Sequence, residues 1–300
     1  MPALAMCIAV FLWASSVVGT KYAIGEIAVA ELIVLRLMLG AAGLWLMVLL
    51  TGADARPRRV GWKPFVMGLL EPGLVTVLFT IGLTLTSPVN GSVLWSLMPL
   101  LMPVLGRIFL GEAIRPVVIV AALLAVGATV LLAWGQRGHG GGSFEGDVLL
   151  VGAVLAAAIN ALIGRRTAQA GANPLVTSSW QVAVACVVTA PLLALLPTAD
   201  RHITSAGSAS LTTVLYLGLV VTVGVFILSN YAMRHMPVGR MALFGCAVGP
   251  VGTALSALVF GTTVTLLDMA AIALVMAAVA LPSLLDLWRG RSLPEPARHG

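Results

Sequence analysis

The chain of 300 residues is 60% hydrophobic and only 9% charged, with a mean hydropathy of +1.06 and a net charge of +6. Because a soluble domain carries about 25% charged residues, this composition excludes an ordinary soluble protein and indicates a membrane protein. The positive net charge therefore does not indicate nucleic-acid binding, since in a membrane protein the positions of Lys and Arg follow the topology.

The apolar segments predict an all-α integral membrane protein with ten transmembrane helices, because a spanning helix requires roughly 20 mainly apolar residues. The predicted spans, in chain order, are 3–21, 31–51, 64–85, 90–109, 115–134, 147–164, 174–196, 209–231, 238–259 and 266–287. We interpret the first as a retained helix rather than a cleaved signal peptide, because no basic residue precedes it and more spans follow.

The basic residues are distributed unequally between the two sides of these spans. One side receives thirteen: Arg56, Arg58, Arg59, Lys63, Arg107, Arg115, Arg165, Arg166, Arg234, Arg240, Arg289, Arg291 and Arg298. The other side receives Lys21, Arg137 and Arg201, whereas Arg36 lies inside a span. The positive-inside rule makes the first side cytoplasmic. We therefore expect a multi-pass protein of the cytoplasmic (plasma) membrane, the inner membrane of a prokaryote, with both termini in the cytoplasm.

An internal repeat divides the chain into two halves of five predicted spans. We expect a first repeat at 1–135, a Gly-rich external linker at 136–146, a second repeat at 147–288 and a cytoplasmic tail at 289–300. Three pairs of residues recur at a separation of 145: Gly19 and Gly164, Lys21 and Arg166, Arg36 and Gln181. With five spans per repeat the second repeat must be inverted. Inverted repeats are typical of transporters that bind substrate near the bilayer midplane.

Two tracts of the first half resemble the EamA domain of the drug/metabolite transporter superfamily. They are FLWASSVVGTKYAI (11–24), followed by Arg36, and MPLLMPVLGRIFLGE (98–112), and the second half is similar over 147–285. The resemblance implies ten helices around one central cavity and the movement of small organic molecules across a membrane. It leaves the substrate and the direction open.

The turn that ends the second tract differs between the halves. The first half has Glu112 after Gly111, whereas the second half has Thr262 after Gly261. We expect Glu112 to cap a helix N-terminus, where a carboxylate is favoured.

Glu71 is the first candidate for a role in transport. It lies in WKPFVMGLLEPGLVTVLFTIGLTL (62–85), directly before Pro72 and Gly73. At 1.5 Å per residue it is about 13 Å deep, near the midplane of a roughly 30 Å hydrocarbon core. Ionisable residues there usually face a cavity or a partner, and Pro72 is expected to kink the helix. We expect Glu71 to contact substrate or to carry a proton; the alternative is a residue that only hydrogen-bonds a neighbouring helix.

Arg36 is the second candidate, roughly 7–8 Å below the outer end of its span. Its guanidinium could extend to the membrane interface, bind an anionic substrate group or reach toward Glu71. The resemblance favours a structural or gating role, because an Arg at this place recurs in the family.

Proline and glycine interrupt corresponding spans in the two halves. The fourth span holds Pro99 and Pro103, and the ninth holds Gly249 and Pro250. Matching interruptions are the best sequence indication of a transporter binding site, whereas the alternative is kinking that permits close helix packing.

Four further side chains are candidates to line a cavity: Trp13, Trp95, Asn160 and Gln181. Asn160 lies 145 residues after Ser15, so both are expected to face the same space. For each of them alone, core packing or an interhelical hydrogen bond is the alternative interpretation.

Catalytic motifs are absent from the sequence, which contains no HExxH, GxSxG or Walker motif. We therefore expect no enzyme, no metal site and no cofactor, and no direct use of ATP.

The prediction is a secondary transporter that exports metabolites, amino acids or drug-like compounds by alternating access, with proton coupling at Glu71. Its expected partners are a small-molecule substrate, the lipid bilayer and protons, but no nucleic acid. An importer or passive facilitator and a non-transporting binding or scaffold protein are the alternatives, and both a monomer and a homodimer stay open.

Overall fold

The structure, a computed structural model, describes residues 2–85, 94, 95, 97–135, 143–196, 202–261 and 266–288, and these residues form helices and no strand. The elements of the first half are α1 (Pro2–Ala23), α2 (Val29–Thr51), α3 (Pro57–Val60), α4 (Lys63–Gly68), the π-helical segment η1 (Leu69–Leu74), α5 (Val75–Leu85), α7 (Met98–Leu110) and α8 (Pro116–Gly135). Those of the second half are α9 (Phe144–Gln169), α10 (Pro174–Thr189), α11 (Leu192–Leu195), the 3₁₀ segment η2 (Ile203–Ser205), α12 (Ser208–Leu215), the π-helical segment η3 (Tyr216–Thr222), α13 (Val223–His235), α14 (Val238–Cys246), α15 (Val248–Phe260) and α16 (Leu266–Trp288).

Seven helical stretches in the described part of the chain are long and apolar enough to cross a membrane, so this is a multi-pass membrane protein. Three shorter apolar helices, Met98–Leu110, Pro116–Ala128 and Ile272–Pro282, coincide with the predicted fourth, fifth and tenth spans. The count of ten spans stays a prediction. The sequence places Glu145 and Gly146 in a linker, but α9 begins at Phe144, so both are helical. The rest of that linker up to 142, and the tail at 289–300, lie outside the described residues.

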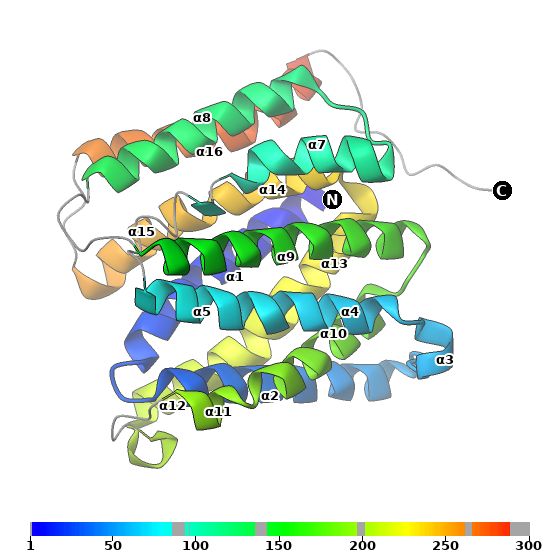
Figure 1. Ribbon diagram of the computed structural model, residues 1–300, viewed down its shortest axis with the longest axis vertical. Coiled ribbons are helices and arrows are strands. Elements are labelled where there is room, and N and C mark those ends of the chain that lie inside the picture. Colours follow the sequence, from blue (N-terminus) through cyan, green and yellow to red (C-terminus); the bar gives the residue numbers. More distant parts are fainter. Residues whose placement is uncertain are drawn as a thin grey trace.

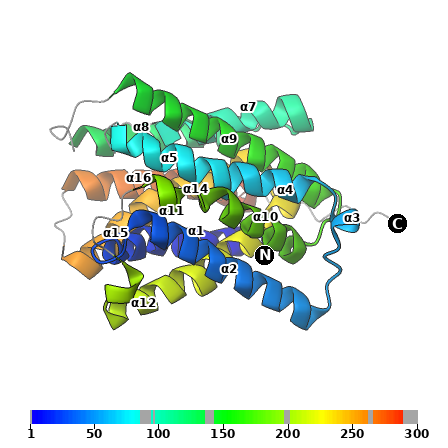
Figure 2. The ribbon, with the colours of Figure 1, turned by 60° about the horizontal axis from the view of Figure 1, so that its bottom comes forward.

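Helices from equivalent places in the two halves pack against each other in pairs. Figure 1 shows α2 and α10 near the bottom of the molecule, α7 and α14 above the middle, and α8 and α16 at the top. In the turned view of Figure 2, α2 and α12 lie on one side and α7 and α9 on the opposite side. The helix axes run roughly along one common direction, as expected for a bundle that crosses a membrane.

Close helix packing recurs at equivalent positions of the two halves. In the first half, a Cβ added at Gly68 would lie 2.3 Å from the Gln181 carbonyl oxygen. In the second half, a Cβ added at Gly218 would lie 2.4 Å from Leu39 Cβ and 3.2 Å from the Arg36 carbonyl oxygen. Only glycine lets backbones approach so closely. Gln181 follows Arg36 by 145 residues, whereas Gly218 follows Gly68 by 150. The register of the repeat therefore lengthens by five residues between the second and third spans.

Candidate functional site

Glu71 occupies a break in the helix of the third span. It lies in η1 between α4 and α5, and its backbone is extended, with φ −140° and ψ 122°. Pro72, the next residue, has no backbone N–H to donate. The interruption removes the Glu71 carbonyl from the regular helical pattern and makes it available to neighbouring side chains. Gly73 follows and is buried in the same segment.

The carboxyl group of Glu71 is bound by a side chain from the other half of the chain. Asn160 of α9 donates a hydrogen bond from Nδ2 to Glu71 Oε2 over 2.9 Å. Asn160 is only 3% exposed, whereas Glu71 is half-buried. The Asn160 Oδ1 atom is buried and has no hydrogen-bond partner. Among the ion pairs that the described residues form, none includes Glu71.

A chain of buried amides holds the backbone of the same residue. Gln181 of α10 donates from Nε2 to the Glu71 carbonyl oxygen over 2.8 Å. Asn230 of α13 donates from Nδ2 to Gln181 Oε1 and to Ser178 Oγ, both over 3.0 Å. The bond from Asn230 fixes which end of the Gln181 amide faces Glu71. Side chains of the second half, from α9 and α10, therefore hold the interrupted helix of the first half.

An apolar wall adjoins the pair of Glu71 and Asn160. Val75, Ala156 and Ala157 form a buried cluster, and Leu70, Trp95 and Met98 pack against it. Trp95 also makes an edge contact with Phe79, with ring centroids 5.5 Å apart. Leu70 precedes Glu71 in the chain, and Ala156 and Ala157 lie one helical turn before Asn160. The segments that carry Glu71 and Asn160 thus also carry an aromatic and aliphatic cluster.

The equivalent region of the other half is built from different groups. Arg36 donates from Nε to Thr222 Oγ1 over 3.1 Å, at the end of η3. No ion pair joins Arg36 to Glu71, so the direct contact between these two candidates is not formed. Ser15 Oγ and the Tyr216 hydroxyl share a hydrogen bond of 2.8 Å. Ser15 and Asn160 therefore each contact the third span of the other half, but they have separate partners.

Trp13 lies away from the site around Glu71. It packs against a buried cluster of α1, α2, α12, η3 and α13 that includes Ile27, Leu217 and Val221. Of the candidates from the sequence, the structure brings together Glu71, Asn160, Gln181 and, through the apolar wall, Trp95.

Two helix interruptions lie at equivalent places in the fourth and ninth spans. Leu97 is a turn residue before α7, and Ala247, 150 residues later, separates α14 from α15. Pro99 lies in the first turn of α7, and Gly249 and Pro250 lie in the first turn of α15.

Pro103 does not break a helix, contrary to the sequence prediction. It lies inside α7, which continues from Met98 to Leu110. A Cβ added at Gly239 would lie 2.7 Å from Pro103 Cγ, so the proline ring occupies the surface where α7 meets α14. Packing accounts for this residue, and the helix tolerates the missing N–H.

The cap predicted for Glu112 forms at the N-terminus of α14. Glu112 Oε2 accepts a hydrogen bond from the backbone N–H of Val238, the first residue of α14, over 3.1 Å. Glu112 Oε1 accepts from Arg165 Nε over 2.8 Å, and Arg165 also donates to the Met233 carbonyl. Glu112 therefore joins the end of α7 to α9 and α14, two elements of the second half.

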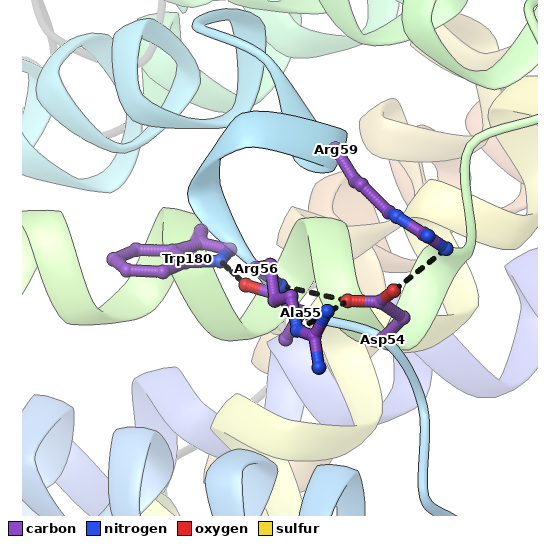
Figure 3. A network of polar contacts seen from close by, with 5 residues as sticks. All are labelled: Asp54, Ala55, Arg56, Arg59 and Trp180. Atoms are coloured by element: carbon purple, nitrogen blue, oxygen red, sulfur yellow. Dashed lines mark hydrogen bonds and ion pairs between the residues drawn. The ribbon is translucent and has the colours of Figure 1, made fainter.

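The connection between α2 and α4 contains the short helix α3, at the right-hand end of the molecule in Figure 1. Figure 3 shows Asp54 between two arginines, with Arg59 Nη1 2.9 Å from its Oδ2 and Arg56 N 3.2 Å from its Oδ1. Trp180 of α10 donates from its indole N–H to the Ala55 carbonyl over 3.0 Å. The Asp54 contacts fold the connection on itself, and the Trp180 bond attaches it to the second half.

Sequence reasoning missed several polar residues that complete these contacts. They are Ser178, Tyr216, Thr222 and Asn230. Asn230 and Thr222 carry a usable signal, because each is a buried polar residue inside an otherwise apolar span, where a hydrogen-bond partner is required.

Comparisons with known proteins support the two-part organisation. The EamA-like transporter family model matches residues 1–134 and 144–284. A solved structure described only as "Crystal structure of protein" is similar, with a TM-score of 0.80 at 22% sequence identity, over 95% of this chain and 98% of that chain. At that identity the likeness establishes the fold alone. No curated protein sequence matches the chain.

Proposed function

Because the chain belongs to the EamA-like transporter family, we propose that it is a secondary transporter that exports small organic molecules by alternating access. The family itself supports a membrane transporter of small molecules. The direction, the mechanism and the coupling to protons are parts of the proposal.

The observation that carries the proposal is the position of Glu71. A carboxyl group lies at a helix interruption inside a spanning segment, and its partners Asn160 and Gln181 come from the other half. Ionisable groups inside a membrane mark substrate or proton pathways. A site held jointly by both repeats changes shape when one repeat moves against the other, as alternating access requires.

Matched helix interruptions support the same mechanism. Each half has two irregular spans at equivalent places: the third and eighth spans contain π-helical segments, and the fourth and ninth contain the turn residues Leu97 and Ala247. Irregular backbone in a membrane protein is tolerated where neighbouring groups satisfy it, and it commonly lines a binding site.

In the orientation that we propose, the side of the membrane that receives thirteen Lys and Arg residues is the cytoplasm, and both termini lie there. Arg59, Arg107 and Arg166 lie at the end of the molecule that carries α3, the α7–α8 connection and the α9–α10 connection (Figure 1). The positive-inside rule assigns such an end to the cytoplasm.

Solute flux in proteoliposomes tests the function. A panel of amino acids, nucleosides and cationic amines is offered with and without a pH gradient to wild type, Glu71→Gln and the exposed control Glu145→Gln. We expect one solute class to accumulate with the gradient in wild type and the control, but not in Glu71→Gln. Equal flux in all three proteins that ignores the gradient would refute the coupling. Failure of the wild type to move any solute would refute the transport function.

A further inference from the structure

The site around Glu71 presents hydrogen-bond acceptors without enough donors. Among the described residues, the carboxyl group of Glu71 receives one hydrogen bond, from Asn160 Nδ2, and takes part in no ion pair. Asn160 Oδ1 is buried without a partner. Buried polar groups in native structures are almost always paired, so an unpaired amide oxygen beside a carboxyl group that lacks an ion-pair partner indicates a group that arrives from outside.

Gln181, the second amide at Glu71, cannot supply the missing donor without breaking bonds that it already makes. Gln181 directs its Nε2 to the Glu71 carbonyl, and its Oε1 accepts from Asn230. An ionised carboxylate only accepts hydrogen bonds, so the Asn160 amide must turn its N–H₂ toward Glu71 and leave Oδ1 as an acceptor. The site therefore combines a negative charge with a second, neutral acceptor.

The surface beside these acceptors is apolar. Val75, Ala156 and Ala157, with Leu70 and Trp95 packed against them, form a buried cluster on the segments that carry Glu71 and Asn160. A ligand that fits the whole site is therefore cationic at one end and hydrophobic at the other. An anionic ligand is disfavoured by the carboxylate.

We propose that this site binds a protonated primary or secondary amine that carries an apolar substituent. The inference rests on the proposed transport function and names its substrate class. A primary ammonium group has three N–H donors, which can serve both the Glu71 carboxylate and Asn160 Oδ1. A quaternary ammonium ion has the same charge but no N–H donor, so it leaves Asn160 Oδ1 unpaired. The site should discriminate between the two.

Isothermal titration calorimetry on the purified full-length protein at pH 7 tests the discrimination. The probes are benzylamine, benzyltrimethylammonium and benzyl alcohol, which share an aromatic body and differ in charge and N–H donors. We expect the Kd of benzylamine to be at least about tenfold lower than that of either other probe, because sites built to bind a donor reject analogues that lack it. The proposal is overturned if benzylamine shows no saturable binding, or if another probe binds as tightly.

Variants then assign the effect to the two residues. Glu71→Gln should weaken benzylamine binding, whereas Asn160→Leu should chiefly remove the preference over benzyltrimethylammonium. Asn160→Ala, which likewise removes the Oδ1 acceptor, is a smaller replacement if the leucine variant does not fold. Tyr216→Phe is the matched control, because it removes one interhelical hydrogen bond, to Ser15, outside this site. An unchanged preference in both Asn160 variants would also overturn the proposal.

The same measurements separate failure of this inference from failure of the transport function. Wild type that moves a non-amine solute but binds no benzylamine refutes the amine class and keeps the transporter. Wild type that binds benzylamine through Glu71 but moves no solute keeps the site and refutes transport.

Discussion

Arg165 and Glu112 form an ion pair between the two halves of the chain, with Nε and Oε1 2.8 Å apart and side chains only 11% and 13% exposed. At the same end, Arg166 donates to the Phe109 carbonyl. At the equivalent place near the opposite end, Lys21 lies over the Phe260 ring, with Nζ 5.1 Å from the ring centroid. The two ends of the molecule are therefore held differently: one by a nearly buried ion pair, the other by a cation–π contact.

Replacing Glu112 with Gln should destabilise the protein strongly. The change leaves Arg165 nearly buried without its counter-ion and weakens the acceptor for the Val238 N–H. Breaking a buried pair by removing one charge costs about 3–5 kcal/mol, and we expect the lower end because both groups keep some exposure. Thermal unfolding in detergent measures the loss. Glu145→Gln, which removes an exposed carboxylate of α9, should change the midpoint little, and equal midpoints in the two variants would contradict the prediction.

Replacing Gly68 with Ala should separate α4 from α10. The added Cβ would lie 2.3 Å from the Gln181 carbonyl oxygen and 2.8 Å from Val184 Cβ, and backbone atoms cannot move aside as a flexible side chain can. Overpacking of this kind costs about 1–3 kcal/mol. Thermal unfolding in detergent should show the loss of stability. Benzylamine binding at Glu71 should also weaken, since Gln181 holds the Glu71 carbonyl.

Gly127 supplies the matched comparison for Gly68. It lies in α8, and a Cβ added there meets nothing within 4 Å. Gly127→Ala should therefore stabilise the helix by about 0.5–1 kcal/mol, from the lower conformational entropy of alanine alone. Destabilisation by both substitutions to the same extent would show that the close approach at Gly68 is not responsible.

Acid should weaken the contact between Glu26 and α12. The backbone N–H of Gly207 donates to Glu26 Oε2 over 2.8 Å and holds the pKa of that carboxyl below its ordinary value of 4.5. A lowered pKa means that the ionised form favours the folded state. The contribution is fully present above the ordinary pKa and is lost as the pH falls through the lowered one.

Comparison of wild type with Glu26→Gln measures this contribution. The glutamine keeps an acceptor but has no charge, so the wild type should unfold at the higher temperature above about pH 5. Below pH 4.5 the difference should shrink as the Glu26 carboxyl becomes protonated. A difference that stays constant down to pH 3, or that grows as the pH falls, would be inconsistent with the lowered pKa.

The regular helices could be predicted from the sequence, because a run of about 20 apolar residues is enough to predict a spanning helix. The sequence predicts spans at 31–51 and 266–287, and the structure has α2 at Val29–Thr51 and α16 at Leu266–Trp288. The effect of a proline could not be predicted in the same way. Pro72 accompanies a real interruption and Pro103 does not, because the outcome depends on what neighbouring helices offer to the freed backbone groups.

The candidate site could be predicted in its members but not in its contacts. Polarity inside apolar spans is enough to select Glu71, Asn160 and Gln181. Their meeting depends on pairs separated by 89 and 110 residues, and no local pattern encodes such distances. For the same reason the partner of Arg36 was not foreseen: Thr222 lies 186 residues away in the other half.

Substitution of Arg36 decides between a structural role and contact with substrate. Arg36 donates to Thr222, and the equivalent residue Gln181 donates to the Glu71 carbonyl. Arg36→Gln keeps a donor of the type that the other half uses, so it should fold. Arg36→Ala and Thr222→Val should each lower stability by about 1–3 kcal/mol, because each removes the interhelical bond between the Arg36 guanidinium and the Thr222 hydroxyl. Thr222→Val also leaves Arg36 Nε without its acceptor, whereas in Arg36→Ala the hydroxyl keeps its bond to the Leu217 carbonyl. If the role is structural, the double variant loses less than the sum of the two single losses, and flux per folded Arg36→Gln molecule equals that of wild type. If Arg36 instead binds an anionic part of the substrate, Arg36→Gln folds normally but loses flux, and Thr222→Val keeps it.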